Sequence, residues 1–133
     1  MKIVFADACY YFALLMDQDQ YAAAAREFTA SYHGKFVTTT AVLTEVGNSL
    51  ARSPKRSAFI PFVEVLVRSP RVDIRHASLD DWDRATRLYD ARPDKAWSLT
   101  DCLSFIVMQD RGLTEAMTAD RRFEQAGFSI LLK

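Results

Sequence analysis

The stretch that most constrains the fold is an apolar helix that follows directly after an acid, Asp101. Six of the seven residues from Cys102 to Met108 are apolar, and at 100° per residue they cover most of a helix circumference. Such a helix must be covered by other elements on nearly every side, which predicts a layered fold built around it. The Ser98-x-x-Asp101 spacing also matches a capping box, so Asp101 has a structural interpretation beside a functional one.

Composition narrows the class of protein. A chain of 133 residues, half of them hydrophobic and without repeats, predicts one globular domain over residues 1–133. Seventeen basic and seventeen acidic residues cancel, which gives no global electrostatic argument for nucleic acid or membrane. The apolar run at the N-terminus is shorter than a signal peptide and no stretch is long enough to span a bilayer, so we expect a cytoplasmic protein. Cys9 and Cys102 could pair, but a reducing compartment favours buried free thiols.

Short apolar runs alternate with helical patterns along the chain. This alternation predicts an α/β fold whose central parallel sheet has about four or five short strands, with helices on both faces. The helix that starts at Ser78 is expected to bury Trp82, Ala85 and either Leu88 or Tyr89. The expected strands are residues 2–6, 35–38, 71–75, 115–118 and 128–132, and the remaining expected helices are residues 10–16, 21–32, 41–52, 57–67 and 121–126.

Four acids fall at corresponding places in this pattern. Asp7 and Asp120 follow expected strands, Glu45 lies one turn into the helix after the second strand, and Asp101 opens the apolar helix. Each has a simpler interpretation: Asp7 and Asp120 suit N-caps, Asp101 suits the capping box that Ser98 begins, and Glu45 lies away from the apolar stripe of its helix. However, the carboxyl ends of parallel strands line one crevice, so a single fold would bring all four together.

Clustered carboxylates imply a particular chemistry. They repel one another, and burial would raise their pKa values unless a cation neutralised them. An oxygen-only donor set suits Mg²⁺ or Mn²⁺, and such ions activate water for phosphodiester hydrolysis. Two basic groups could contact phosphates or could simply be solvated helix faces; they are Arg52, Lys55 and Arg56, and Arg121 and Arg122.

Four segments in this order and spacing resemble the PIN domains, especially the short ribonucleases of the VapC toxin type, over nearly the whole chain. The segments are Val4-Phe5-Ala6-Asp7, Thr44-Glu45-Val46, Ser98 to Phe105, and Thr118 to Phe123 with Ala126-Gly127-Phe128. The resemblance implies a PIN-like three-layer fold and an RNA-cleaving activity. It also implies that Asp7, Glu45, Asp101 and Asp120 are the catalytic residues and bind Mg²⁺ or Mn²⁺, with Ser98 and Thr118 as supporting hydroxyls.

Two segments depart from the pattern that is frequent in the family. Ala8 and Cys9 follow Asp7 where a Thr or Ser is common, and Arg122 stands where a His is common. Two alternatives stay open beside the ribonuclease: a nuclease that acts on DNA, and a PIN-fold module that binds RNA or regulates with little turnover.

The resemblance further implies a homodimer that a small antitoxin protein holds inactive. Two apolar helical segments, residues 10–16 and 57–67, are candidate interfaces, although they could instead complete the core. The side chains that suggest an interface are Tyr10, Tyr11, Phe59, Phe62 and Val63.

Overall fold

The computed structural model describes residues 2–133. Over this range strands and helices alternate, largely as the sequence predicts. The strands are β1 (Ile3–Ala6), β2 (Lys35–Thr39), β3 (Val72–Arg75), β4 (Glu115–Met117) and β5 (Ser129–Ile130). The helices are α1 (Ala8–Leu15), α2 (Ala22–Ser31), α3 (Thr40–Leu50), the 3₁₀ turn η1 (Arg56–Ala58), α4 (Phe59–Arg68), α5 (Leu79–Ala91), α6 (Leu99–Asp110) and α7 (Arg121–Gln125).

The strands described between residues 2 and 133 form one sheet, and every pairing in it is parallel. Its order is β3-β2-β1-β4-β5, so the first strand of the chain lies at the centre. Val4, Phe5 and Ala6 of β1 are fully buried, as a strand covered on both faces must be. The prediction of a parallel sheet of four or five short strands is therefore confirmed.

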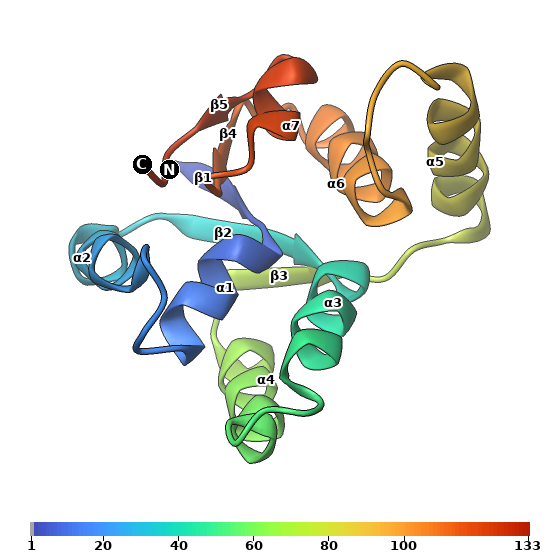
Figure 1. The fold of residues 1–133 in the computed structure, drawn as a ribbon. Helices are drawn as coiled ribbons and strands as arrows, with labels where there is room; N and C mark the ends of the chain where they lie inside the picture. The colour runs from blue at the N-terminus through green and yellow to red at the C-terminus, as the bar shows by residue number, and fades with distance from the viewer. Residues whose placement is uncertain (1) are drawn as a thin grey trace.

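Helices cover both faces of the sheet and complete a three-layer α/β fold (Figure 1). Helices α1, α2 and α4 lie on one side, α5 and α6 lie on the other, and α3 contacts both α1 and α6. Every residue from Asp101 to Met108 of α6 is buried, which confirms the central helix that the apolar pattern predicts. The helix ends at Asp110, and Gly112 follows shortly after it with a φ of 64°, which favours glycine.

The helices are short. The longest, α5, has 13 residues. Among residues 2–133 no helix is both long enough and apolar enough to cross a bilayer.

Two expectations about buried side chains are wrong. Trp82 is about half exposed on α5, because the side of the helix that packs on α6 carries Ala85, Leu88 and the buried carboxylate of Asp81. Of the two alternatives Leu88 and Tyr89, Leu88 is the one that packs against the core. The spacing of apolar residues does not identify the buried side of a helix when that side also buries an ion-paired carboxylate, as α5 does with Asp81.

The second correction concerns Tyr10 and Tyr11, which were expected at an interface. Both are 2% exposed and belong to the core of this chain, within a cluster of aromatic rings. Tyr10 stacks on Phe36, and the Tyr11 ring meets Phe62 edge to face. The helix that carries them also starts two residues earlier than expected, directly after Asp7.

Candidate functional site

Asp7 is a buried carboxylate held by a hydroxyl that directly follows a neighbouring strand. It occupies the N-cap position of α1, but its side chain accepts no capping hydrogen bond there. Instead, Thr118, the residue after β4, donates its hydroxyl hydrogen to Asp7 Oδ2 at 2.9 Å. No basic side chain within residues 2–133 forms an ion pair with it. The simple N-cap interpretation therefore fails for Asp7.

The surroundings of Asp7 raise its pKa to about 7, and burial is the main cause. The hydrogen bond from Thr118 lowers the pKa, whereas the charges of Asp101 and Glu45 raise it further. The carboxyl group therefore changes between its protonated and its charged form near neutral pH, and a cation beside it would favour the charged form.

Asp101 forms the capping box that its spacing predicts. Its backbone N–H donates to Ser98 Oγ at 3.0 Å, and the Ser98 backbone N–H donates to Asp101 Oδ2 at 2.9 Å. Burial raises the pKa of Asp101, as does the charge of Asp120, while the Ser98 N–H and Arg122 lower it. Oδ1 accepts no hydrogen bond from residues 2–133. The cap thus uses one oxygen and leaves the other available.

Glu45 and Asp120 lie at the outer part of the same site. Burial raises the pKa of Glu45, the charges of Asp101 and Asp120 raise it further, and the Thr100 hydroxyl lowers it. Asp120 caps α7, because its Oδ1 accepts from the backbone N–H of Arg122 at 2.9 Å. Its own N–H donates to Thr118 Oγ1 at 3.1 Å.

One hollow collects these acids at the edge where the parallel strands end. Three of the four acids line it, and its volume is about 230 Å³. Asp101 is coupled to the other three by charge. The fold therefore brings the predicted quartet together, through β1, the helix after β2, the loop after β4 and the start of α6. The lining residues are Asp7, Ala8, Cys9, Phe12, Glu45, Val46, Ser49 and Asp120.

The basic residues named from the sequence behave differently from one another. Arg122 lies at the acids: its Nη1 is 3.3 Å from Asp120 Oδ2 and its Nε is 4.0 Å from Asp101 Oδ2. Arg121 is 86% exposed and pairs with Glu124. The other group, Arg52, Lys55 and Arg56, is exposed in the turn after α3, and none of the three is bonded to the quartet.

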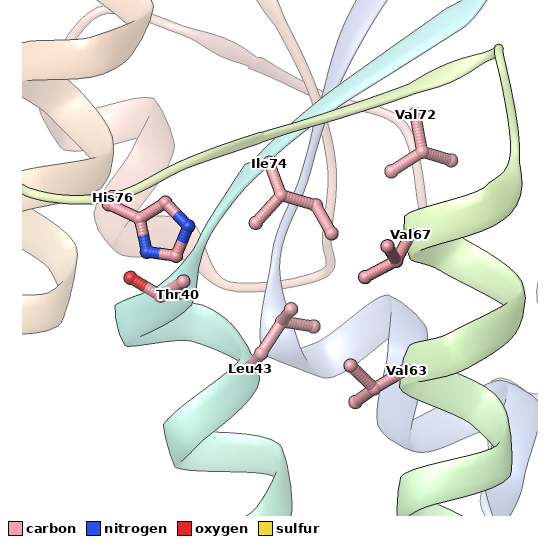
Figure 2. Close-up of a pocket in the computed structure, with 7 residues that line it drawn as sticks. All are labelled: Thr40, Leu43, Val63, Val67, Val72, Ile74 and His76. Atoms are coloured by element: carbon pink, nitrogen blue, oxygen red, sulfur yellow. The ribbon is translucent and has the colours of Figure 1, made fainter.

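A second hollow is apolar and carries no acid. It lies between α3, α4 and β3 and has a volume of about 370 Å³ (Figure 2). Although it is larger, it offers no group for acid–base or metal chemistry other than His76. Its lining residues are Thr40, Leu43, Val63, Val67, Val72, Ile74 and His76.

The donor chemistry of the acidic hollow suits a divalent ion. Its donors are carboxylate oxygens. Asp7 is buried without a basic partner, and a bound cation would supply the missing positive charge. As the side chains stand in residues 2–133, no three of them from His, Cys, Asp or Glu are close enough to hold one ion. Mg²⁺ needs only one or two carboxylates beside its waters, so the donor chemistry of the hollow suits such an ion.

Two features of the site were not found from the sequence. The first is the Thr100 hydroxyl, which lies beside Glu45. The second is the half-buried thiol of Cys9, which lines the hollow. Cys102 is buried, and both thiols are free. Thr100 is part of the Ser98-Leu99-Thr100-Asp101 segment, so its closeness to Asp101 was the available signal. The structure also shows a hydroxyl bonded to Asp7 although Ala8 and Cys9 offer none, because Thr118 supplies it across the sheet.

Comparison with known proteins agrees with this fold. The sequence matches the PIN domain model over residues 4–129. VapC20 of Mycobacterium tuberculosis, a sarcin-ricin loop cleaving toxin, aligns with a TM-score of 0.86 at 26% identity over 96% of each chain. None of the curated proteins compared by sequence is a match. This chain therefore belongs to the PIN domain family and, within it, to the VapC type.

More distant structures show the same fold. DNA-bound VapBC of Salmonella typhimurium aligns with a TM-score of 0.66 at 15% identity, over 98% of each chain. FitAcB of Neisseria gonorrhoeae aligns with a TM-score of 0.65 at 14% identity, over 98% of this chain and 96% of its own.

Proposed function

We propose that this protein is a Mg²⁺- or Mn²⁺-dependent endoribonuclease, a hydrolase of RNA phosphodiester bonds, and the toxin of a toxin–antitoxin pair. The observation that carries the proposal is the acidic hollow, where Asp7 is buried without a basic partner, Glu45 and Asp120 share the lining, and the charge of Asp101 acts on Asp7. A fold that only needed capping residues would have no reason to bring these charges together.

The residues around the hollow have separable roles in this proposal. Asp7, Glu45, Asp101 and Asp120 would hold the divalent ion. When bound, the ion would acidify a water and stabilise the leaving oxygen. Thr118 fixes the Asp7 carboxylate through its 2.9 Å hydrogen bond, and Ser98 fixes the first turn that carries Asp101. These two hydroxyls orient the acids without touching the substrate.

RNA is favoured as the substrate by the likeness to VapC20, which is a sarcin-ricin loop cleaving toxin. Arg122 is the basic side chain best placed to meet a phosphate at the acids. A DNA substrate remains the rival, since the site contains no feature that reads a 2′-hydroxyl. A binding module with little turnover is the second rival, and the intact quartet argues against it.

A small antitoxin is the proposed partner, because similar structures are toxin–antitoxin complexes. A homodimer and a cytoplasmic location belong to the same proposal. The apolar surface that remains for a dimer is on α4, where Ile60 and Val65 are 60% and 66% exposed and Phe59, Phe62 and Val63 are partly exposed.

The activity test uses purified protein, a pool of single-stranded RNA and a matched pool of DNA. We expect RNA cleavage that EDTA abolishes and that Mn²⁺ or Mg²⁺ restores. The Asp101→Asn variant should lose at least about a hundredfold in rate, because it removes one negative charge and one donor from the ion. Equal cleavage in EDTA, or a full rate in the variant, would show that the metal proposal is wrong. Cleavage of DNA alone would establish the rival nuclease.

A further inference from the structure

Arg122 is tied to two of the four acids at once. Its backbone N–H donates to Asp120 Oδ1 at 2.9 Å, and its guanidinium Nη1 lies 3.3 Å from the other oxygen of that carboxylate. Its Nε lies 4.0 Å from Asp101 Oδ2. Within residues 2–133 no other basic side chain forms an ion pair with any of the four acids.

We propose that Arg122 is a built-in counter-ion of the acidic site. It neutralises Asp101 and Asp120 while no divalent ion is bound, and it gives way when one binds. The guanidinium is then free to hold a phosphate of the substrate. The release to phosphate rests on the proposed function, whereas the competition with the ion does not.

The reach of its charge supports this role. Arg122 lowers the pKa of Glu45 as well as that of Asp101, so one positive charge acts on three acids of the quartet. The carboxylates that it approaches are also donors that a metal ion would use, through Asp120 Oδ2 and through Asp101 Oδ1, the oxygen that the cap leaves available. An ion and the guanidinium cannot both be placed against these two carboxylates without repelling each other.

The exposure of Arg122 makes it displaceable. Its side chain is 45% exposed, and ion pairs in contact with water are weak and flexible. An arginine released into the mouth of the hollow presents a planar fork that matches a phosphate. A histidine, which is common in the family at this position, has a charge that changes with pH in the physiological range and would not serve as a permanent counter-ion.

The experiment compares Arg122→Gln with Arg121→Gln. The control removes the neighbouring charge, which is 86% exposed and pairs with Glu124 instead of the quartet. Calorimetric titration with Mn²⁺, at low ionic strength and without RNA, should show the Arg122→Gln variant binding roughly threefold to tenfold more tightly than wild type. The Arg121→Gln variant should bind within about twofold of wild type.

Two further readouts identify the role as electrostatic. The metal-free melting temperature at pH 8 should fall in Arg122→Gln and not in Arg121→Gln, because the repulsion among the acids is then unopposed. Arg122→Lys, which keeps the charge, should restore both the melting temperature and the wild-type Mn²⁺ affinity. If Arg122→Gln did not fold, comparison of Arg122→Met with Arg122→Lys would decide the same question.

Equal Mn²⁺ affinity in the Arg122 and Arg121 variants would overturn the proposal, as would weaker binding in Arg122→Gln or no binding in any protein. None of these measurements needs RNA. A protein that binds Mn²⁺ as expected but cleaves no RNA would therefore refute the proposed function and leave the role of Arg122 intact.

Discussion

Helices α5 and α6 begin with the same motif and put it to different uses. Each starts with Ser-x-x-Asp, and in each the serine and the aspartate form a reciprocal capping box. The hydrogen bonds are nearly equal: 3.0 and 3.1 Å at Ser78 and Asp81, and 3.0 and 2.9 Å at Ser98 and Asp101. Both carboxylates are buried.

The charges around the two motifs differ. Arg75, at the end of β3, donates two hydrogen bonds to Asp81, at 2.6 and 3.1 Å, and lowers its pKa. Asp101 meets a guanidinium nitrogen only at 4.0 Å and has Asp120 beside it, and its pKa is raised. A capping aspartate with a full counter-ion stabilises the fold. One without it is available to a ligand.

The largest effect on stability is expected at Asp7. This residue sharpens the comparison because its buried carboxylate forms neither a capping hydrogen bond nor an ion pair within residues 2–133. Its pKa rises from 3.8 to about 7 on folding, so between these values the folded state holds more protons than the unfolded state. Metal-free stability should therefore fall as pH rises from about 4 to 7, by on the order of 4 kcal/mol at most.

The Asp7→Asn variant removes that ionisation. Urea unfolding at several pH values in EDTA should show a flatter profile for the variant, and a higher stability than wild type above pH 7. A wild-type stability that rises over the same interval would contradict the assignment.

A smaller effect is expected where the pair at Asp81 is broken. Arg75→Ala leaves a buried carboxylate with only its cap, and should lower the free energy of unfolding by about 2–4 kcal/mol. The matched control is Arg87→Ala on α5, the helix that carries Asp81. Both side chains of the Arg87–Asp83 pair are exposed, so this variant should lower the free energy of unfolding by less than about 0.5 kcal/mol. Equal losses in the two variants would mean that Asp81 does not depend on Arg75.

The smallest effect concerns the two caps themselves. Ser78→Ala and Ser98→Ala each remove one acceptor from a helix start, and each should lower stability by about 1 kcal/mol. If the motifs are locally the same, the two losses measured by thermal unfolding in EDTA should agree within about 0.5 kcal/mol. A far greater loss at Ser98 would show that this serine supports more than the first turn of α6.

The fold was largely predictable because its signals are local. The apolar run at residues 3–6, the capping serines and the glycines after α6 and α7 each determine a nearby piece of backbone. Glu45 was correctly placed off the core stripe of its helix. What the helical period could not show is that this exposed side of α3 borders the acidic hollow.

The side-chain environment was less predictable because it depends on partners far along the chain. The burial of Asp81 needs Arg75 on another element, and this pair, not the apolar pattern, decides which side of α5 faces inward. The Thr118 to Asp7 hydrogen bond joins residues 111 positions apart. No spacing rule within one helix could distinguish Asp101 from Asp81, since the two motifs are locally alike.

The most direct test of this account is Mn²⁺ binding to wild type, Asp81→Asn and Asp101→Asn, each confirmed to be folded by circular dichroism. Calorimetry or the paramagnetic signal of free Mn²⁺ gives the affinity without any substrate. The account predicts that Asp81→Asn binds as tightly as wild type, while Asp101→Asn binds at least about tenfold more weakly. Equal affinity in all three proteins, or a loss shared by both variants, would contradict the claim that only the second capping aspartate belongs to a metal site.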